Sequence, residues 1–406
     1  MVSQLIVTTV SDQTQPNVLL IKEYGDAQTE HLFLSTKKMN SNGIPQRIER
    51  ACGIQHTYMC EVESDSRADV INKLDALHLP FDSYEKIIVN LTGGTKAMSL
   101  AVFSYFEGKP NATLLYKPTD NFFIDFRTNE HIEIKTRLTI EEYLTAYGIT
   151  PEREKPSGVS PEQTDIVYSH FIHLNLLDYF DQFSFLREKR GRKIIENDFC
   201  KVEKFVNAIH YKPITGNQLS KEEIVYLSGG WFEEWLKQHL QQQLNLSYEH
   251  ISGGMKMSSD NPRSKWKNDI KNIIGQEPEK EDVPNELDVV IMYENTLYTI
   301  ECKSSVFDIQ VKEEAGTDGQ KRTKLKERNI LGETIFKSDS LQKLFGLRPQ
   351  TVIMTLTNID SECKKDTSKL QSFINSLNRA NLSNIRIVDL QQIESKKDNL
   401  FELIKQ

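Results

Sequence analysis

The chain has 406 residues, 38% hydrophobic and 27% charged, so it is long enough for two or three globular domains with apolar cores. It has no run of about 18 apolar residues and no signal-peptide pattern at its start, so we expect no membrane span. Five scattered cysteines without C-x-x-C pairs argue against disulfides and structural zinc, and favour the reducing cytoplasm. A net charge of −8 excludes a general basic coat for nucleic acids, which would need local basic patches.

Strands and helices alternate through residues 1–150. Apolar, β-branched segments predict strands at residues 5–10, 31–36, 57–62 and 86–91. Helical patterns lie between them at residues 16–24, 45–53, 67–77 and 96–106. This order predicts a Rossmann-like, mostly parallel sheet with helices on both faces, and residues 112–117 and 121–126 add a hairpin at one edge. Ligands of such sheets bind at the carboxyl ends of the strands.

A polar glycine loop follows the strand at residues 86–91. Gly93 and Gly94 let backbone N–H groups approach an anion, and the helix that begins near Ala97 adds its dipole. Further donors come from Thr92, Thr95 and Lys96. The loop matches neither the Walker A nor the G-x-G-x-x-G pattern, and an ordinary strand-to-helix turn is the alternative interpretation. The equally polar residues 9–15 would lie at the same sheet edge, which favours a phosphate site there.

The rest of the chain predicts two further units. Residues 151–220 combine a polar, proline-containing linker with helical patterns at 168–183 and 197–211, typical of a small helical or winged-helix module. Residues 221–406 predict a compact α/β domain, in which a helical basic stretch follows a β-hairpin. Two basic clusters could contact phosphates or form solvated faces: Arg263, Lys265, Lys267 and Lys271, and then Lys321, Arg322, Lys324, Lys326 and Arg328.

The predicted hairpin carries the most informative residues. Apolar strands at 287–293 and 297–303 flank a short turn, so Glu301 and Lys303 share one face while Cys302 faces the other. Asp288 begins the neighbouring strand and can reach the same face. Carboxylate oxygens are the ligands that Mg²⁺ and Mn²⁺ prefer, and a nearby lysine can orient water or neutralise charge on a phosphate. The pattern therefore favours metal-dependent cleavage of phosphodiesters, although an acid and E-x-K also occur in strands by chance.

A third acid precedes this hairpin in the chain. Residues 227–244 predict a helix that opens after a Gly-Gly turn, with Trp231, Trp235 and Leu236 on its apolar stripe. Either Glu233 or Glu234, in the first turns, can face the sheet. The alternative for Glu233 is a surface pair with Lys237, four residues later.

Taken together, these motifs resemble a known family. With its NLTGGTKAM segment, the N-terminal half resembles a CARF domain, the sensor of cyclic oligoadenylates in type III CRISPR defence. With GGWFEEW and D-x(12)-E-C-K, the C-terminal half resembles the restriction-endonuclease-like PD-(D/E)XK domain that is fused to CARF in the CRISPR ancillary nucleases (DUF1887-like). The resemblance implies domains at 1–150 and 221–406, joined by residues 151–220.

The resemblance also implies roles for particular residues. Contacts to the cyclic nucleotide would come from Thr9, Ser11, Gln13, Thr92, Gly93, Gly94, Thr95 and Lys96. The nuclease motif implies Asp288, Glu301, Lys303 and Glu233 as catalytic residues, with the three acids holding Mg²⁺ or Mn²⁺. Relatives often carry K-L and then Gly-Gly in the next helix. This chain has Lys324 and Leu325, followed by Leu331, Gly332 and Glu333.

The same resemblance implies partners and substrates. It implies a homodimer, because a symmetric ring can be held by two identical pockets at a dyad. Cyclic tetra-adenylate is the implied activator, with cyclic hexa-adenylate as the alternative. The implied substrates are single-stranded DNA and RNA, which would be cleaved, and duplex DNA, which would be nicked. Two rival functions remain: a ligand-regulated transcription factor, and a ring nuclease that degrades the cyclic nucleotide in the first domain.

Overall fold

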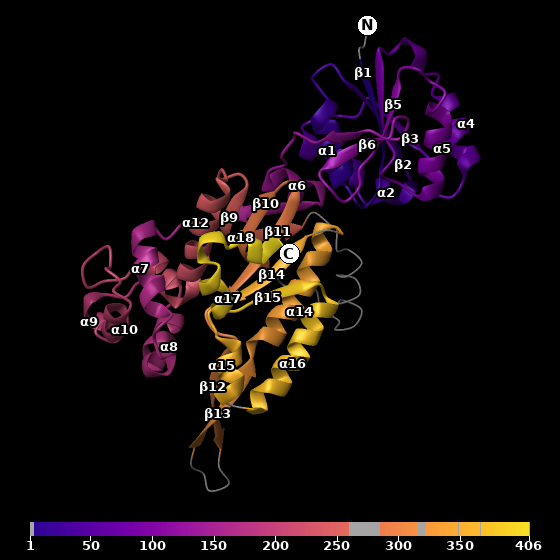
Figure 1. Cartoon of the computed structure of the whole chain (residues 1–406). Coiled ribbons are helices and arrows are strands. Elements are labelled where there is room, and N and C mark those ends of the chain that lie inside the picture. Colours follow the sequence, from indigo (N-terminus) through magenta and orange to yellow (C-terminus); the bar gives the residue numbers. More distant parts are fainter. Residues whose placement is uncertain (1–3, 260–284, 316–320, 348, 366, 406) are drawn as a thin grey trace.

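The computed structural model describes residues 4–259, 285–315, 321–347, 349–365 and 367–405 of the chain (Figure 1). In these ranges it contains a seven-stranded sheet, a six-stranded sheet and a separate two-stranded hairpin. Helices cover the large sheets, which gives the predicted α/β class. None of the helices in these ranges is long and apolar enough to cross a membrane.

The first sheet confirms the predicted Rossmann-like order. Five parallel strands lie in the order β3-β2-β1-β4-β5, and β6 and β7 continue the sheet antiparallel at one edge. The strands are β1 (Gln4–Thr9), β2 (Glu30–Ser35), β3 (Tyr58–Glu61), β4 (Lys86–Asn90), β5 (Ala112–Tyr116), β6 (Phe122–Asp125) and β7 (His131–Glu133). The helices are α1 (Gln15–Tyr24), α2 (Lys37–Ser41), α3 (Ile44–Cys52), α4 (Arg67–Ala76) and α5 (Lys96–Phe106). Because helices cover both faces, the central strands are apolar throughout rather than alternating.

The second sheet has the order β15-β14-β11-β10-β9-β8. Strands β8 to β11 are antiparallel neighbours, whereas β14 and β15 run parallel to β11. The strands are β8 (Ile149–Arg153), β9 (Ile251–Ser259), β10 (Asn285–Tyr293), β11 (Thr296–Lys303), β14 (Gln350–Thr355) and β15 (Ile385–Val388). Its helices are α12 (Trp231–Leu244), α14 (Ile330–Gln342), α15 (Ile359–Lys365), α16 (Thr367–Leu382), α17 (Leu390–Ser395) and α18 (Phe401–Lys405). Tryptophans 231 and 235 of α12 are fully buried, as the apolar stripe predicted.

The prediction of a helical basic stretch after the catalytic hairpin is wrong. Residues there form the antiparallel pair β12 (Phe307–Ala315) and β13 (Lys321–Asn329), which projects from the domain (Figure 1). The register places Asp308 opposite Arg328 and Glu314 opposite Arg322. Apolar residues alternate in the sequence of β12, at Phe307, Ile309 and Val311, with the period of two that favours a strand over a helix. The other basic cluster, residues 263–271, lies outside the described residues, as do the side chains of β12 and β13.

A helical module follows β8 in the chain and lies on the side of the second sheet away from the first domain (Figure 1). It contains α7 (Pro161–Phe171), α8 (Phe180–Glu188), α9 (Glu196–Phe199), α10 (Glu203–Ala208) and α11 (Lys221–Val225). The helix predicted over 168–183 is in fact two helices, α7 and α8, with a short 3-10 turn between them. The Tyr168 ring stacks on Trp235 of α12 at 3.8 Å between ring centroids, so the module packs on the second domain.

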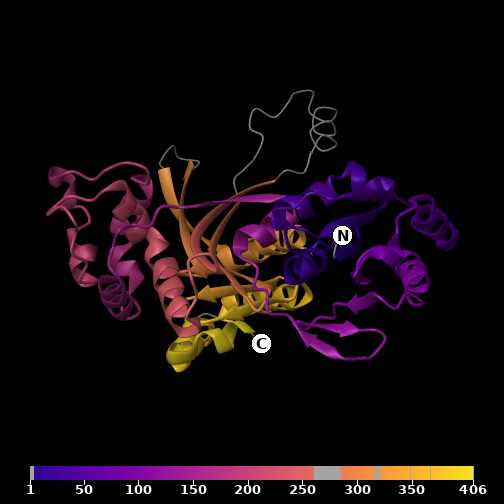
Figure 2. The same cartoon turned by 90° about the horizontal axis from the view of Figure 1, so that it is seen from above.

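One continuous apolar core joins the two sheets. It combines Val10, Val18 and Ile48 of the first domain with Val290 and Leu297 of the second. The connecting helix α6 (Ile140–Ala146) adds Tyr143, whose hydroxyl donates to the Phe345 carbonyl at 2.8 Å. A view from above shows the first sheet close beside this part of the second domain (Figure 2). The junction is therefore a packed interface rather than a loose tether.

Candidate functional site

The hairpin β10–β11 brings Asp288, Glu301 and Lys303 together as predicted. The strands are antiparallel, with Val289 opposite Ile300, and the turn between them occupies Glu294 and Asn295. Cys302 is buried in the apolar core, so Glu301 and Lys303 share the other face. One detail differs from the expectation: β10 begins at Asn285, three residues before Asp288.

Three oxygen atoms converge on the Lys303 ammonium. Its Nζ atom lies 3.1 Å from Asp288 Oδ2, 3.1 Å from Glu301 Oε2 and 3.1 Å from the Cys302 carbonyl. Asp288 Oδ2 also accepts the Cys302 backbone N–H at 2.7 Å. The second oxygen of Glu301, Oε1, accepts from Lys337 of α14 at 2.8 Å. Both carboxyl groups are buried, and the Glu301 side chain is only 2% exposed.

Burial and like charge raise the pKa values of two acids of this site, Asp288 and Glu233. Burial raises the pKa of Asp288, the charge of Glu301 raises it further, and Lys303 acts against both. Burial and then the charge of Asp288 raise the pKa of Glu233 well above its ordinary range. For Lys303, burial alone would lower the pKa, but Asp288 and Glu301 outweigh it and raise the pKa. Perturbed carboxyl groups of this kind cluster at functional sites.

Helix α12 places Glu233 and Glu234 in different surroundings. Glu234 accepts from the backbone N–H of Ser157 at 3.1 Å and from its hydroxyl at 2.8 Å. Glu233 is half-buried and lies within electrostatic reach of Asp288 and Lys303. Among the described ion pairs, none joins Glu233 to Lys237. Glu233 also lines a cleft of about 680 Å³ between α12, β9 and the linker at 152–159.

The donor set suits a hard divalent cation. Two buried carboxylates and a backbone carbonyl already surround one positive charge, the Lys303 ammonium, which stands in for a cation. Mg²⁺ commonly uses one or two carboxylates and takes its other ligands from water and substrate. Within the described part of the chain, no three His, Cys, Asp or Glu residues lie close enough to form a metal cluster by themselves. Asp288 and Glu301 are thus the protein ligands that fit, with Glu233 set further back.

Three residues near this site escaped the sequence analysis. Lys337 bonds to Glu301 and also donates to the Glu286 carbonyl at 2.9 Å. Glu286 lies two residues before Asp288 on β10, and burial raises its pKa. Arg190 of the helical module donates from Nε to Ser228 Oγ at 2.8 Å, and its charge reaches Glu233. Lys337 and Arg190 lie far from E-x-K in sequence, so only the fold could reveal them.

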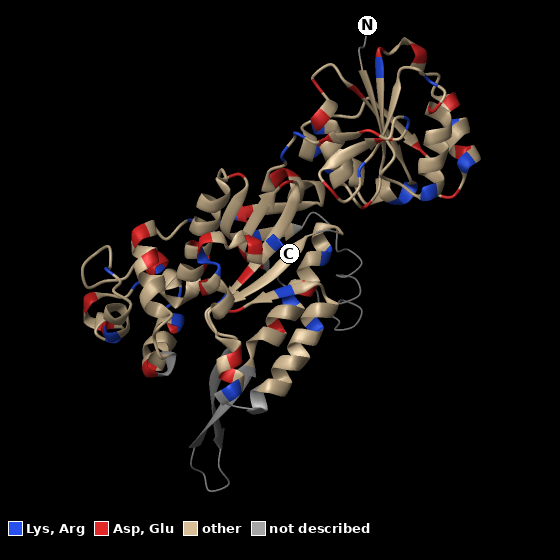
Figure 3. Cartoon of the chain, in the orientation of Figure 1, with Lys and Arg blue, Asp and Glu red and all other residues tan. Residues whose placement is uncertain are grey.

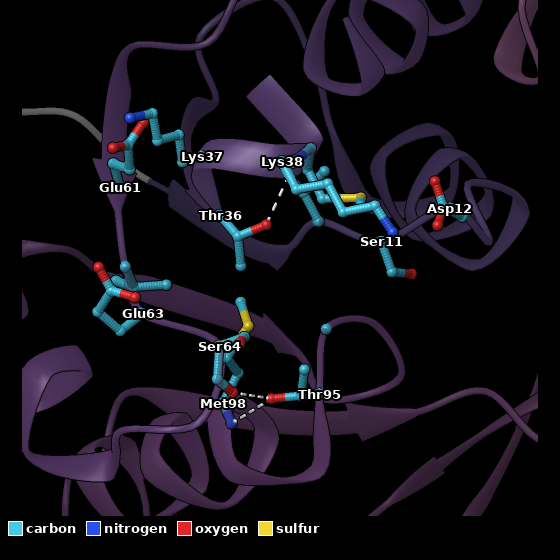
Figure 4. Close-up of a pocket in the computed structure, with 14 residues that line it drawn as sticks. Ser11, Asp12, Thr36, Lys37, Lys38, Glu61, Glu63, Ser64, Thr95 and Met98 are labelled. Carbon is cyan, nitrogen blue, oxygen red and sulfur yellow. Dashed lines mark hydrogen bonds between the residues drawn. The ribbon is translucent and has the colours of Figure 1, made fainter. Parts of the chain in front are cut away.

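A cavity of about 470 Å³ lies at the carboxyl ends of the first-domain strands (Figure 4). Ser11, Gly94 and Thr95, three of the residues expected to contact the cyclic nucleotide, line it. Thr95 caps α5 by accepting the Met98 N–H at 3.2 Å. A further part of the wall was not anticipated: it is formed by Thr36, Lys37, Lys38, Glu61, Glu63 and Ser64, at and after the ends of β2 and β3. Strand order alone could have located this wall, because β2 and β3 end at the same sheet edge.

The other expected ligand residues lie around the cavity without lining it. Thr9 is fully buried and donates to the Asn90 carbonyl at 3.2 Å. Thr92 Oγ1 accepts the Lys117 N–H at 2.7 Å. Gly93 is packed so tightly on β1 that a Cβ atom would lie 2.0 Å from the Thr9 carbonyl oxygen. Lys96 is exposed on the first turn of α5.

The loop after β1 also touches the second domain. Gln13 Oε1 accepts the Leu347 N–H at 3.0 Å, just beyond α14. Gln15 Nε2 donates a hydrogen bond to the carbonyl of Asn295, in the turn of the β10–β11 hairpin. The same cavity-lining loop therefore contacts both elements that reach Glu301. The sequence analysis expected Gln13 to contact a ligand instead.

In the view of Figure 3, Lys and Arg are interspersed with Asp and Glu along the ribbon of the described residues. This mixture agrees with the negative net charge. Binding of a nucleic acid would therefore depend on local cations such as those beside the acidic cluster.

Comparisons with known proteins agree with this geometry. Residues 5–143 match the family model described as the Card1 CARF domain. Can2 from Sulfobacillus thermosulfidooxidans, solved with cyclic tetra-adenylate, is similar in structure over 99% of both chains, with a TM-score of 0.65 and 19% identity. VC1899 from Vibrio cholerae matches over 99% of this chain and 98% of its own, with a TM-score of 0.67 and 15% identity.

A third solved structure matches in part. It is a type III CRISPR defence DNA nuclease activated by cyclic oligoadenylate, with a TM-score of 0.51 and 15% identity, over 87% of this chain and 45% of that one. No curated protein sequence matches the chain significantly. Residues 5–143 thus match the Card1 CARF domain, and the fold of the whole chain is similar to the folds of Can2 and VC1899.

Proposed function

We propose that this protein is a metal-dependent nuclease that cyclic oligoadenylate activates in type III CRISPR defence in the cytoplasm. Its substrates would be DNA, RNA or both, cleaved with little sequence preference. Its activator would be cyclic tetra-adenylate, with cyclic hexa-adenylate as the alternative. The Card1-type CARF domain and the fold shared with Can2 support the regulatory part of this proposal.

One observation carries the catalytic part. Two buried carboxylates and a carbonyl oxygen surround a lysine ammonium at 3.1 Å, on a hairpin of the D-x(12)-E-x-K pattern. Burying two acids is costly, and a purely structural role is better served by apolar residues of similar size. The convergence of oxygen atoms on one positive charge is what a cation-binding site requires.

The residues of the site have separable tasks. Asp288 and Glu301 would hold Mg²⁺ or Mn²⁺, which when bound supplies a Lewis acid for the scissile phosphate. Lys303 would then be free to neutralise charge on that phosphate or to orient the attacking water. Glu233, at the edge of the 680 Å³ cleft, would act as the third acid beside the substrate. Contacts to phosphate rather than to bases would give the low sequence preference.

The first domain would act as the sensor. Its cavity offers donors from Ser11, Thr95 and Lys38 together with acids from Glu61 and Glu63, a mixture that suits phosphates and adenine amino groups. A symmetric ring would be held between two such cavities, so we expect a homodimer. The exposed apolar side chain of Leu100, one turn after Lys96 on α5, would be covered in that dimer.

The test is a cleavage assay. Labelled single-stranded DNA, single-stranded RNA and duplex DNA would be incubated with Mg²⁺ or Mn²⁺ and a panel of cyclic oligoadenylates. Cleavage that needs both metal and one ring size would support the proposal, with the Asp288→Asn variant as the negative control. Activator binding without cleavage of any substrate would instead favour a ligand-regulated DNA-binding protein. Degradation of the cyclic oligoadenylate during the incubation would favour a ring nuclease.

A further inference from the structure

Glu301 is held by two lysines with different positions in the fold. Lys303, from the same strand, contacts Oε2 and also reaches Asp288 and the Cys302 carbonyl. Lys337, from α14, contacts Oε1 at 2.8 Å and otherwise only the Glu286 carbonyl, at 2.9 Å. The carboxyl group is therefore fixed at both oxygens, one on each side.

The two lysines are not equivalent with respect to a cation. A metal ion placed where the three oxygens converge would take over the contacts of Lys303. Lys337 contacts Oε1 of Glu301 and the Glu286 carbonyl, neither of which is among the three converging oxygens. These contacts would therefore remain when the metal ion is bound. Lys337 would then be the group that keeps the Oε2 atom of Glu301 turned towards Asp288. Partners of this kind, which orient a ligand without touching the metal, strongly affect metal sites.

We propose that Lys337 is a positioning residue for Glu301 in the nuclease reaction. This inference rests on the proposed function. Lys337 fixes the rotation of the carboxyl group, and it ties the metal-binding hairpin to helix α14. Its side chain is 40% exposed, whereas that of Glu301 is 2% exposed, so Lys337 closes the outer side of the site.

Helix α14 gives this contact a second consequence. Beyond the helix, the Phe345 carbonyl accepts from Tyr143, and the Leu347 N–H donates to Gln13. Leu341 and Phe345 are buried in the core shared by the two domains. The orientation of Glu301 is thus connected, through Lys337 and one continuous helical segment, to the loop that lines the CARF cavity.

The test uses a pair of substitutions and a matched control. Lys337→Met removes the charge and keeps the length of the side chain, and Lys337→Arg keeps the charge. Lys343→Met is the control, because Lys343 follows the same helix and pairs with Asp339 at the surface. Activated cleavage would be measured as kcat and KM for single-stranded DNA, together with thermal stability.

We expect kcat of Lys337→Met to fall about 10- to 100-fold with KM little changed. Lys337→Arg should recover most of the rate, and Lys343→Met should stay within about twofold of wild type, as expected for an exposed pair. Mn²⁺ affinity by calorimetry should not fall in Lys337→Met, because both carboxylates remain and a repelling charge is gone. Wild-type kcat in Lys337→Met, or no recovery in a folded Lys337→Arg, would overturn the inference.

A spectroscopic measurement separates this inference from the proposed function. The electron paramagnetic resonance spectrum of bound Mn²⁺ reports the arrangement of its ligands without requiring turnover. Lys337→Met should change that spectrum and Lys343→Met should not. An unchanged spectrum would refute the positioning role even if the wild type is a nuclease. If the wild type cleaves no substrate, the proposed function fails, and the spectrum still decides whether Lys337 orients Glu301.

Discussion

Asp288 and Glu301 are stabilised by different partners, although they lie on adjacent strands of one hairpin. Asp288 accepts hydrogen bonds from one backbone N–H and from the ammonium of Lys303. Glu301 accepts hydrogen bonds from two ammonium groups, those of Lys303 and Lys337. Removing either charge therefore leaves lysines without a full counter-charge in a buried site. Both substitutions should damage metal binding more than the fold, because an amide keeps the size and part of the hydrogen bonding of the acid.

We therefore expect Glu301→Gln and Asp288→Asn to lower activated cleavage at least about 100-fold. Affinity for the cyclic oligoadenylate should be unchanged, since the CARF cavity is formed by other residues. Lys303→Ala should bind metal but cleave slowly. Cleavage assays and calorimetry with the activator would test these expectations. Wild-type-like cleavage by Glu301→Gln would remove the basis of the nuclease assignment.

The raised pKa values of Asp288 and Glu233 predict a pH dependence. Folding raises both pKa values, so the metal-free protein holds these protons more tightly than the unfolded chain does. The resulting stabilisation is present at acidic pH and is lost as the pH rises through the folded-state pKa values. A metal ligand must be deprotonated, so metal affinity should change in the opposite direction and increase with pH.

Calorimetry in two buffers of different ionisation enthalpy would measure this effect. Mn²⁺ binding near neutral pH should release protons, and its affinity should be lower at pH 6 than at pH 8. The Asp288→Asn variant should release fewer protons. Binding with equal affinity at both pH values and no proton release would show that the acids are already ionised in the metal-free protein.

At the scale of elements, the glycine loop combines two roles that substitutions can separate. Gly93 packs on β1, where a Cβ atom would lie 2.0 Å from a backbone oxygen, so Gly93→Ala forces the two strands apart. Lys96 is exposed at the start of α5 and has no such structural role. Its ammonium is free to meet a phosphate of the activator.

Gly93→Ala should therefore weaken activator binding and lower the melting temperature. The free energy of unfolding should fall by about 1–3 kcal/mol, as at other overpacked sites. Lys96→Ala should leave stability unchanged and weaken activator binding by about ten- to a hundredfold, the usual effect of losing a hydrogen bond to a charged group. Thermal melts and calorimetry with cyclic tetra-adenylate would separate the two effects. Unchanged affinity in Lys96→Ala would show that the phosphates of the activator do not contact Lys96.

Strands with a continuous apolar run could be predicted from the sequence. Elements and residues whose role depends on contacts with distant parts of the chain could not. Strands 86–90 and 296–303 are buried on both faces, so their apolar runs identify them without knowledge of the fold. The hairpin β12–β13 carries many charged residues and no continuous apolar run, so the basic residues of β13 were assigned to a helix. Lys337 carries no local signal either, because its link to Glu301 spans 36 residues and depends on how α14 packs.

At the scale of the whole molecule, the motifs predicted the order of the domains along the chain. They did not predict the contacts by which the two domains pack against each other. Asn295 was predicted only as part of a hairpin turn. In the structure it is 3% exposed and adopts a left-handed conformation with φ of 61°, which asparagine tolerates well. Its side chain accepts the Leu138 N–H at 2.8 Å and donates to Asn121 at 2.8 Å and to the Thr136 carbonyl at 2.9 Å.

This turn is the tip of the hairpin that carries Asp288 and Glu301, the proposed metal ligands. Three of its four contacts come from residues 121–138, and the fourth comes from Gln15 beside the cavity-lining loop. A nuclease with little sequence preference needs an inactive state without activator. A shift from 1% to 99% active requires about 5.5 kcal/mol of differential binding, which must be transmitted through contacts between the domains. The Asn295 turn and the α14 contact at Gln13 are the polar candidates.

We expect Asn295→Asp to uncouple the domains. Aspartate tolerates the same backbone and can still accept from Leu138, but it replaces a donor with an acceptor opposite Thr136 and Asn121. The ratio of activated to basal cleavage should fall at least about tenfold, the equivalent of about 1.4 kcal/mol of coupling, while the intrinsic metal affinity stays the same. Glu294→Asn is the matched control, because Glu294 is the exposed, left-handed neighbour in the same turn.

Reciprocal binding provides the measurement that does not depend on turnover. If the two sites are coupled, the activator increases the affinity for single-stranded DNA. Single-stranded DNA with metal must then increase the affinity for the activator by the same factor. In the Glu301→Gln background, which preserves the substrate, this tightening should be present with Glu294→Asn and reduced with Asn295→Asp. Calorimetric titration of the activator with and without DNA would show it. If DNA increases activator affinity equally in both variants, the hairpin turn does not transmit the coupling. The polar contacts of the α14 segment, from Gln13 through Leu347 to Lys337 and Glu301, would then be the next candidate among the described residues.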